Sequence, residues 1–373
     1  MEGFDKCYNC LMYTIFKGIK VLDFTKVLSG PLATRYLADY GAEVIKIESK
    51  SHPDPARKFP PLKTNWSGYF EVFNRNKQSL ELDISTKKGR NAFYSLVKEA
   101  DVVVENMRPS AKSKLKVDYE TLRQIQPTLI YASLAGIDQK TDKKYFDVIA
   151  QAESGMMSLT GIDEPTKIGP AVVDAYAGLT LAFGIASALF KRERTGKGSS
   201  ISVSMLASAI NLLEHNLIES SITKQNPVLP GNHDNAIAPF GIYKTKDGRV
   251  VIAIGTDTQW EAFANYYNLQ SKKYRTNAMR LSAGDDLTFL IEQVFANAST
   301  KMIINNLHKL HIPCAKVQTM QDVLNNKWMY ESGALSRNKS FTTTGYSLHF
   351  ENEAKKATIK APALGQHNKK HEL

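Results

Sequence analysis

A strand–helix–strand pattern at residues 19–48 constrains the fold of this chain more than any other feature. Residues 19–24 (IKVLDF) and 43–48 (EVIKIE) have the composition of strands. Between them, Ser29-Gly30-Pro31 marks a helix start with proline in the first turn, and Gly41 lies where the helix would end. Because two strands joined through a helix run parallel, the pattern predicts a parallel α/β sheet that binds ligands at the carboxyl ends of its strands.

The alternation of strands and helices continues along the chain. Further strands are expected at residues 79–84, 101–105, 128–134 and 200–203, and helices at 87–99, 175–190 and 205–217. This alternation is typical of a doubly wound, Rossmann-like sheet.

The character of the sequence changes at Gln225, where a stretch rich in proline, glycine and asparagine begins. A hairpin signature at Lys246-Asp247-Gly248 and helices from Thr258, Asp285 and Thr300 follow it. We predict an N-terminal extension (1–17), a large Rossmann-like domain (18–224), a smaller α/β domain (225–325) and a C-terminal segment (326–373). The last segment has strand-like runs at 346–350 and 357–359 and is expected to return to the large domain.

The apolar run at residues 175–190 is shorter than the about 20 residues that a membrane-spanning helix requires, and Thr180 and Ser187 interrupt it. It predicts a buried helix and no membrane association. Three cysteines in 373 residues cannot form a disulfide framework, and Cys7 and Cys10, a CxxC pair, lack the second pair of a zinc site. We therefore expect a cytoplasmic protein.

An excess of basic residues gives the chain a formal net charge of +11. Such a charge is compatible with nucleic acid, an anionic membrane surface or an anionic small molecule as partner. The basic clusters, at 112–116, 140–144, 191–197 and 272–275, are short, and acidic residues interrupt several of them. Nucleic-acid binding needs a more continuous basic surface. The sequence thus predicts no nucleic-acid partner, and a solvated basic surface remains an alternative to an anionic small ligand.

The familiar cofactor motifs are absent from the sequence. Residues 26–33 contain one glycine, so the GxGxxG pattern of a dinucleotide site is missing, and no P-loop is present. The eight histidines show no metal-ligand spacing with cysteine or acidic residues. We predict no NAD, no FAD and no metal, whereas the helix start at Ser29 suits a phosphate or carboxylate group.

Two aspartates are the candidates for chemistry. Asp174 follows the apolar Ala171-Val172-Val173 and opens the long apolar helix, where the helix dipole would keep a nucleophilic carboxylate ionised. The alternative is a helix-capping aspartate. Asp147 lies in the apolar run 145–151 and is either a capping or salt-bridged aspartate or a catalytic acid.

Nine segments together resemble the family III CoA transferases, from about Lys17 to the C-terminus. They are VLDFTKVLSGPLATRYLADYGAEVIKIE (21–48), FNRNKQSLELD (73–83), DVVVENMRP (101–109), YFDVIAQAESG (145–155), VVDAYAG (172–178), GKGSSISVSM (196–205), GNHDNAIAPFGIY (231–243), HIPCAKV (311–317) and APALGQH (361–367). The resemblance implies a Rossmann-like large domain, a smaller domain and an interlocked homodimer of two ring-like subunits.

The resemblance also implies an activity and a site. Asp174 matches the family's nucleophile, which attacks an acyl-CoA, becomes an aspartyl-CoA thioester and passes CoA to a small carboxylic acid. Asp147 matches an acid that lines the site. Coenzyme A would be contacted by residues at matching positions: Val27, Leu28, Ser29, Leu82, Asn106, Met107, Lys114 and Lys144.

Departures from the family pattern leave the acyl substrate open. Leu28 and Ser49 replace a glutamine and an arginine of some transferases, and residues 231–240 replace a glycine-rich loop, which argues against a formyl-CoA and oxalate pairing. An acyl-CoA racemase of the same family is the alternative activity, but Phe146 stands where its histidine base would be. A protein that binds acyl-CoA or nucleic acid without catalysis remains if Asp174 is only a helix cap.

Overall fold

A computed structural model of the chain describes residues 11–12, 14–64, 66–229, 231–269, 272–337, 341–350, 356–357 and 359–371. Cys7 and Cys10 lie outside these residues. The chain forms two compact units: unit 1 comprises Met1–Met156, Ile168–Leu217 and Trp328–Leu373, and unit 2 comprises Met157–Lys167 and Ile218–Lys327. The short stretch Met157–Lys167, which the sequence places in the large domain, thus belongs to unit 2.

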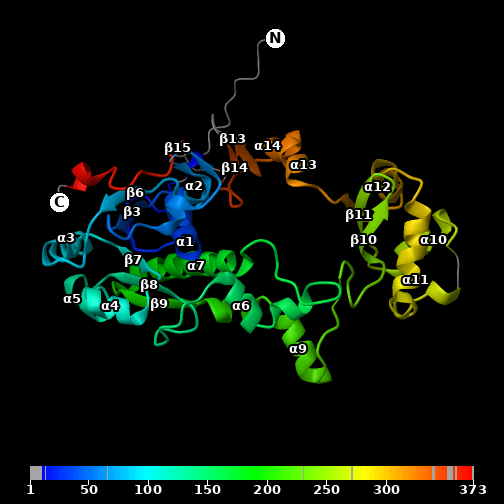
Figure 1. Cartoon of the computed structure of the whole chain (residues 1–373), viewed down its shortest axis with the longest axis horizontal. Coiled ribbons are helices and arrows are strands. Elements are labelled where there is room, and N and C mark those ends of the chain that lie inside the picture. The colour runs from blue at the N-terminus through cyan, green and yellow to red at the C-terminus, as the bar shows by residue number, and fades with distance from the viewer. Residues whose placement is uncertain are drawn as a thin grey trace, which may run out of the picture. The chain divides into compact units, whose positions relative to one another are not determined.

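Unit 1 is built around a six-stranded parallel sheet with the order β6-β3-β2-β7-β8-β9 (Figure 1). The strands are β2 (Lys20–Asp23), β3 (Glu43–Glu48), β6 (Gln78–Glu81), β7 (Val102–Glu105), β8 (Ile130–Ala135) and β9 (Ser199–Ser204). The apolar side chains of β2 and β7 are fully buried, as expected when both faces of a parallel sheet are covered. The predicted parallel α/β fold is confirmed.

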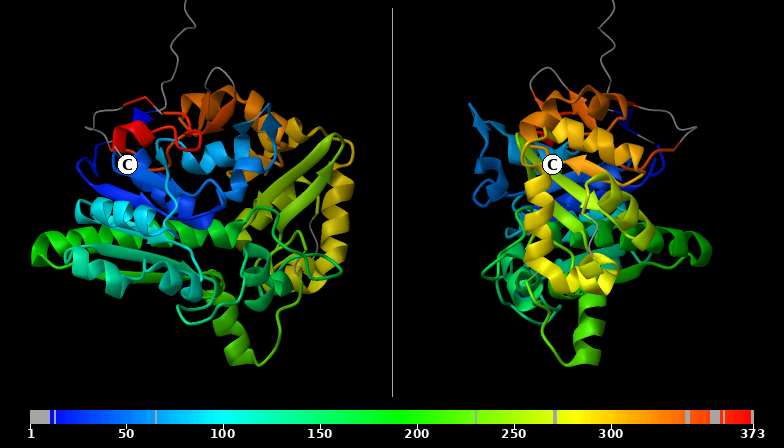
Figure 2. Two further views of the ribbon diagram at one scale, coloured as in Figure 1. Left: turned by 60° about the vertical axis from the view of Figure 1, so that its left-hand side comes forward. Right: turned by 90° about the vertical axis from the view of Figure 1, so that its right-hand side faces the viewer.

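Helices cover both faces of this sheet. The helices of unit 1 are α1 (Ser29–Asp39), α2 (Gly68–Asn74), α3 (Lys87–Lys98), α4 (Pro109–Leu115), α5 (Tyr119–Ile125), α6 (Asp147–Glu153), α7 (Val172–Thr195) and α8 (Met205–Asn211), and α9 (Glu214–Thr223) crosses into unit 2. Helices α3 and α5 share a core with one face, and α1 and α7 pack together on the other. Figure 2 shows α7 as the long green helix.

Among the helices of the described residues, only α7 is long and apolar enough to cross a membrane, as judged by its length and composition alone. One face of it, with Val173, Ala177, Leu181 and Ile185, is buried in unit 1. That face packs on α1, β8 and β9, whereas Leu179, Phe183 and Phe190 on the other face are exposed, so the predicted buried helix is buried on one face only.

Unit 2 has an antiparallel sheet of its own, β10 (Phe240–Thr245), β11 (Gly248–Ala253) and β12 (Cys314–Lys316). Helices α10 (Asp257–Tyr266), α11 (Asn277–Phe295) and α12 (Thr300–Lys309) enclose a separate apolar core with these strands, and α13 (Met320–Asn325) follows. Helix α11 is kinked at Gly284, whose φ of 43° is not helical, so its second part begins at the predicted Asp285. Its first part, from Asn277, was not predicted; the Thr276 side chain caps it by accepting a hydrogen bond from Met279 N.

The remaining elements are short. They are β1 (Leu11–Met12) paired with β15 (Lys356–Ala357), β4 (Leu62–Lys63) with β5 (Trp66–Ser67), β13 (Leu335–Arg337) with β14 (Thr342–Thr344), α14 (Lys327–Glu331), and the 3₁₀ helices η1 (Pro55–Lys58), η2 (Met156–Leu159), η3 (Lys272–Tyr274) and η4 (Asn368–His371).

The C-terminal segment lies against β6, where Gly365 N donates to Ser79 Oγ at 3.1 Å and Glu81 N donates to Asn368 Oδ1 at 2.9 Å. The strand predicted at 346–350 does not form. Instead, the rings of Tyr346 and Phe350 pack on the ring of Tyr40. These aromatic contacts form without any pairing of strands.

Candidate active site

A cavity of about 660 Å³ lies in unit 1 where β2, β7 and β8 end at their carboxyl termini. This is the edge at which a parallel sheet is expected to bind ligands. Its lining includes most of the predicted site residues: Val27, Leu28, Ser29, Asn106, Met107, Lys144 and Asp174.

Asp174 lies in the first turn of α7 and faces this cavity. Its Oδ1 accepts a hydrogen bond from the Ser29 hydroxyl. Burial raises the pKa of Asp174 to about 6, the Ser29 hydrogen bond opposes that rise, and the charge of Asp147 adds to it. The carboxylate is therefore ionised at neutral pH and only weakly solvated, which favours a nucleophile.

Asp147 caps α7 from outside that helix. Its Oδ1 accepts hydrogen bonds from Val173 N at 2.9 Å and Asp174 N at 3.1 Å, while Ala171 at the N-cap position makes no side-chain cap. Gln151 Nε2 donates to the other oxygen at 2.6 Å, and Gln151 Oε1 accepts from Ile168 N at 2.9 Å. Asp147 is thus engaged in capping and does not line the cavity described above.

The loop between β2 and α1 has an unusual backbone. Val27 has φ 73°, in the left-handed region that a β-branched residue rarely adopts. Its N–H donates to Asp54 Oδ1 at 3.2 Å, and Asp54 forms a fully buried ion pair of 2.9 Å with Lys46. Lys46 Nζ also donates to Thr25 O at 2.6 Å. A buried charge pair therefore holds this turn, and the Val27 N–H is already engaged.

Asn106 ties the loop after β7 to the loop after β2. Its amide donates to Lys26 O at 2.9 Å and its carbonyl oxygen accepts from Lys26 N at 3.0 Å. The Asn106 side chain therefore orients the lining of the cavity through the backbone of Lys26.

Two predicted contact residues lie elsewhere. Leu82 packs on the core beneath α3, and Lys114 is exposed on α4; neither lines the cavity. Sequence reasoning missed several lining residues and the buried Gln151. Some of the missed lining residues are chain neighbours of predicted ones, which is the signal that would have found them: Lys26, Arg108, Lys143 and Tyr145.

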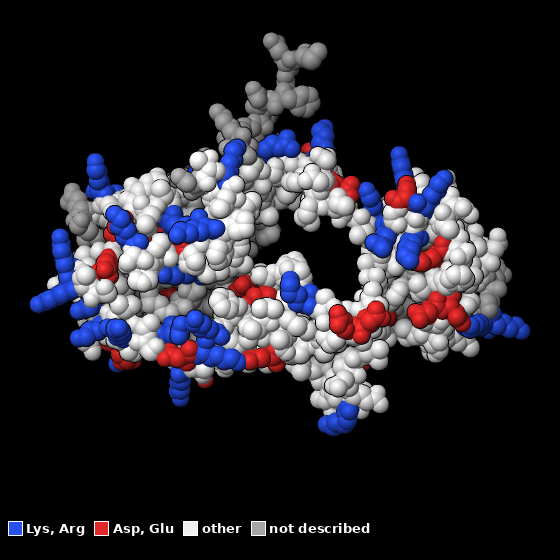
Figure 3. All heavy atoms as spheres, viewed as in Figure 1, with Lys and Arg blue, Asp and Glu red and all other residues white. Residues whose placement is uncertain are grey.

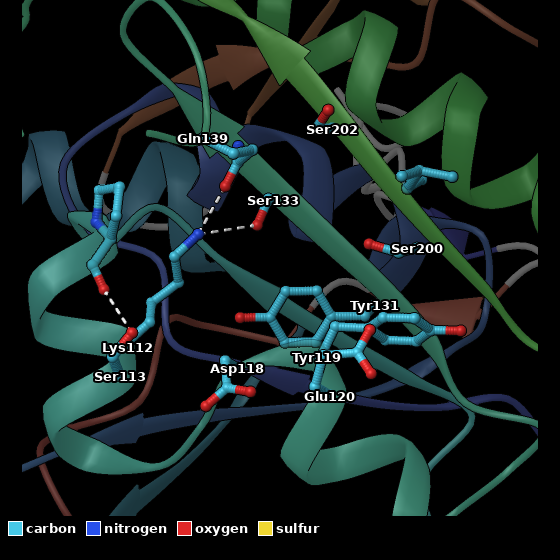
Figure 4. Close-up of a pocket in the computed structure, with 12 residues that line it drawn as sticks. Lys112, Ser113, Asp118, Tyr119, Glu120, Tyr131, Ser133, Gln139, Ser200 and Ser202 are labelled. Atoms are coloured by element: carbon cyan, nitrogen blue, oxygen red, sulfur yellow. Dashed lines mark hydrogen bonds between the residues drawn. The ribbon is translucent and has the colours of Figure 1, made fainter. Parts of the chain in front are cut away.

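A second cavity, of about 370 Å³, lies beside β8 and β9 (Figure 4). Lys112 Nζ points to Gln139 and Ser133 there and also donates to Glu105 Oε1 at 3.0 Å. Glu105 Oε2 in turn accepts from Met107 N at 2.7 Å. None of the predicted site residues lines this cavity, so we read its polar network as support for the Met107 loop.

Within the described residues, no group of three or more His, Cys, Asp or Glu side chains could hold a metal ion. On the face in Figure 3, Lys and Arg side chains are interspersed with Asp and Glu.

Substituting Gly178 with alanine is expected to disturb the site. A Cβ at Gly178 would lie 2.6 Å from Ser29 O and 3.3 Å from Leu32 Cβ, so α1 must move away from α7. Separation of Ser29 from Asp174 should lower any catalytic rate of this site at least about tenfold, and overpacking should lower the free energy of unfolding by about 1–3 kcal/mol. Steady-state kinetics and urea unfolding measure the two effects.

Gly184→Ala is the matched control on the same helix. Its new Cβ would meet Ile201 Cδ1 at 3.3 Å, the end of a flexible side chain. We expect this variant to keep its activity and to gain up to about 1 kcal/mol from helix propensity. Equal activity in the two variants would show that the close contact of α1 and α7 does not matter to the site.

Comparison with known proteins gives a consistent result. The model of the CoA-transferase family III matches residues 16–368. Succinyl-CoA:mesaconate CoA-transferase of Haloarcula hispanica is 33% identical, with 94% of this chain and 93% of that protein covered. Succinyl-CoA:glutarate CoA-transferase of Mus musculus is 32% identical, with 97% and 86% covered. The crystal structure of a CAIB/BAIF family protein from Brucella suis superposes with a TM-score of 0.88 at 29% identity and covers 97% of this chain and 99% of that one.

Proposed function

The chain belongs to the CoA-transferase family III, and we propose that it moves CoA from an acyl-CoA donor to a carboxylic acid through a thioester on Asp174. The observation that carries this proposal is the Asp174 carboxylate, which lines a 660 Å³ cavity and has a pKa of about 6 because it is buried. Such a carboxylate is ionised at neutral pH yet poorly hydrated, and so is more reactive than one in water.

In the proposed reaction, an Asp174 oxygen attacks the carbonyl carbon of the donor thioester. The carbon–sulfur bond breaks, CoA leaves as a thiolate, and a mixed anhydride joins the acyl group to Asp174. The thiolate then attacks the aspartyl carbonyl carbon and expels the donor acid as a carboxylate. An acceptor carboxylate reverses both steps and leaves as the new acyl-CoA.

Four cationic side chains line the cavity and support CoA binding: Lys26, Arg108, Lys143 and Lys144. CoA carries a pyrophosphate and a 3′-phosphate, for which lysine and arginine are the natural partners. Lys143 also forms an ion pair with Glu153, whereas Lys26 Nζ donates to His52 O at 2.8 Å. CoA binding would thus account for a small part of the excess of basic residues that gives the chain its +11 net charge.

The relatives suggest which substrates to test first. Two of them are named for succinyl-CoA as the donor and for mesaconate or glutarate as the acceptor. We therefore propose succinyl-CoA as donor and a dicarboxylic acid as acceptor. A panel of acyl-CoA donors against mono- and dicarboxylates, with products identified by mass spectrometry, tests this pairing; efficient transfer restricted to monocarboxylates would contradict it.

The covalent step has a direct test. Incubation with succinyl-CoA and no acceptor should yield protein that carries one CoA in thioester linkage, measured as intact mass. Hydroxylamine should release the CoA and leave a hydroxamate that peptide mapping locates at Asp174. Transfer activity with the label at another residue, or with no label in the pre-steady state, would overturn the Asp174 mechanism.

The alternatives predict different results. A racemase exchanges the α-proton of its acyl-CoA, so incorporation of deuterium from D₂O without CoA transfer would favour it. Phe146 lines the cavity at the position of the racemase base and has no proton to exchange. A non-catalytic binding protein would bind acyl-CoA, or retard nucleic acid at physiological salt, without forming the thioester.

We also propose that the protein is a homodimer. Leu179, Phe183 and Phe190 form an apolar stripe on the outer face of α7, with exposed fractions of 53%, 73% and 66%. Exposed apolar stripes of this kind mark interaction surfaces, and a second copy of the chain agrees with the family resemblance.

Phe183→Asp is expected to convert the dimer to monomer, since it places a charge in the centre of the stripe. Size-exclusion chromatography with light scattering measures the mass. Phe289→Asp, at a residue that is 65% exposed on α11, is the control and should remain dimeric. A dimer unchanged by Phe183→Asp would place the interface elsewhere.

A further inference from the structure

Ser29 is the side chain in direct contact with the proposed nucleophile. We propose that its hydroxyl is a catalytic residue that fixes which Asp174 oxygen attacks the donor and then stabilises the oxyanion that forms on the other oxygen. This inference rests on the proposed function and gives Ser29 a role different from a simple contact with CoA. It is carried by the hydrogen bond from Ser29 Oγ to Asp174 Oδ1.

The surrounding structure holds Ser29 rigidly. Ser29 is 4% exposed and is the first residue of α1, directly after the left-handed turn at Val27. Asp54 fixes that turn through the Val27 N–H, and the close approach of Gly178 to Ser29 O brings α1 and α7 together. The hydroxyl is thus positioned before any substrate binds, which is the condition for effective electrostatic catalysis.

The hydrogen bond distinguishes the two carboxylate oxygens. Oδ1 accepts the hydrogen bond from Ser29, whereas Oδ2 accepts no hydrogen bond from the described residues. Attack on the donor is therefore expected from Oδ2. When Oδ2 bonds to the acyl carbon, the carbon–sulfur electron pair leaves with CoA, and Oδ1 becomes the carbonyl oxygen of the mixed anhydride.

The same hydrogen bond then serves the second step. As the CoA thiolate bonds to the aspartyl Cγ, the carbonyl electron pair moves onto Oδ1, where the Ser29 hydroxyl already lies. Collapse of this tetrahedral intermediate restores the carbonyl group and breaks the bond from Cγ to Oδ2, so that the acyl group leaves as a carboxylate. No net proton transfer is required, and Ser29 keeps its proton throughout.

The electrostatics of the ground state agree with this role. Burial raises the pKa of Asp174, and the hydrogen bond from Ser29 lowers it. Without the hydroxyl, a larger fraction of Asp174 is protonated at a given pH and cannot attack. Loss of Ser29 is therefore expected to change the pH dependence of the reaction as well as its maximal rate.

The experiment compares Ser29→Ala with Ser67→Ala in the full-length protein. Ser67 is equally buried, at 4% exposed, and its hydroxyl donates to Phe59 O at 2.6 Å, so its loss controls for general destabilisation. The measurements are the rate of thioester formation with succinyl-CoA from pH 5 to 9 and the KM for the acyl-CoA. Ser29→Thr retains a hydroxyl and tests rescue.

In Ser29→Ala we expect the acid limb of the pH–rate profile to move up by about one unit, as the loss of a hydrogen bond to a charged group predicts. The rate on the alkaline plateau should fall by about 10²–10³-fold, as for loss of one oxyanion donor. The KM should change by less than about threefold, because Ser29 acts on Asp174 and not on CoA. Ser67→Ala should keep the acid limb, and Ser29→Thr should restore it.

Three outcomes would overturn the inference: an unshifted acid limb in Ser29→Ala, a plateau rate within about twofold of wild type, or a raised KM at unchanged kcat, which is the signature of a CoA contact. If Ser29→Ala does not fold, Ser29→Gly, which also lacks the hydroxyl, takes its place with the same expected and contradicting results. Asp174→Asn distinguishes a failure of the proposed function from a failure of the role of Ser29. Thioester formation in that variant refutes the proposed function, whereas its absence together with a normal Ser29→Ala refutes only the role of Ser29.

Discussion

Asp174→Asn is expected to abolish CoA transfer while it makes the folded protein more stable. The amide cannot form the anhydride or the thioester, so the transfer rate should fall by about 10⁴-fold or more, as when a covalent nucleophile is removed. The stability gain arises because the wild-type protein keeps an ionised carboxylate in a buried position. An uncharged isostere avoids that cost.

The gain should depend on pH in a defined direction. The pKa of Asp174 is about 6 in the folded protein, against an ordinary value of 3.8. Between these values the unfolded chain loses its proton first, so this group lowers wild-type stability as the pH rises from about 4 to 6, and above about 6 the full cost is present. The cost is up to about 3 kcal/mol.

Urea unfolding of both proteins at pH 4.5 and pH 8 measures this effect as a difference, which removes the contributions of other groups. We expect Asp174→Asn to be more stable than wild type at pH 8, by an amount that shrinks at pH 4.5. Asp163→Asn, at an exposed position, should match wild type at both values. If Asp174→Asn is less stable than wild type at pH 8, the ionised carboxylate stabilises the folded protein, and its burial does not carry the expected cost.

Lys77→Ala is expected to cause the largest loss of stability. Lys77 is fully buried, and its ammonium group donates three hydrogen bonds, to Asp23 Oδ2 at 2.9 Å, Pro31 O at 3.0 Å and Asn74 Oδ1 at 3.0 Å. Removal leaves the buried Asp23 carboxylate without its closest cation, a change that costs about 3–5 kcal/mol. Because Pro31 lies in the first turn of α1, the position of Ser29 should be disturbed as well.

Lys273→Ala is the control for this variant. Lys273 pairs with Asp286 at 2.7 Å, but the two side chains are 57% and 70% exposed, so its loss should cost less than about 1 kcal/mol. Urea unfolding measures both variants. If the two losses are equal, the buried cluster around Asp23 contributes no more than a surface ion pair.

The parallel sheet could be predicted from the sequence because its signals are local. The β3 strand at Glu43–Glu48 agrees with the prediction at both ends, since the β-branched Val44, Ile45 and Ile47 favour a strand. The helix predicted at 205–217 is wrong in its continuity: Leu212 and Leu213 separate α8 from α9. Nothing in the apolar periodicity of that segment marks the break.

The arrangement of the site could be predicted only in part. Asp174 was recognisable from its place before an apolar helix, but its neighbours come from distant segments. Asp147 reaches the N–H of a residue 27 positions away, and Asn106 binds the backbone of a residue 80 positions away. The left-handed conformation of Val27 could not be predicted from the sequence either, because valine rarely adopts it. Tertiary contacts with Asp54 and Lys46 decide it.

The division of the chain into two units has a consequence for experiments on its acceptor preference. Every residue that lines the Asp174 cavity belongs to unit 1, whereas residues 231–240, which replace the glycine-rich loop of some relatives, belong to unit 2. The residues of the proposed covalent chemistry and the 231–240 segment therefore lie in separate stretches of the chain. A chimaera that takes residues 218–327 from a relative would test whether acceptor preference follows unit 2 while the proposed chemistry at Asp174 stays with unit 1.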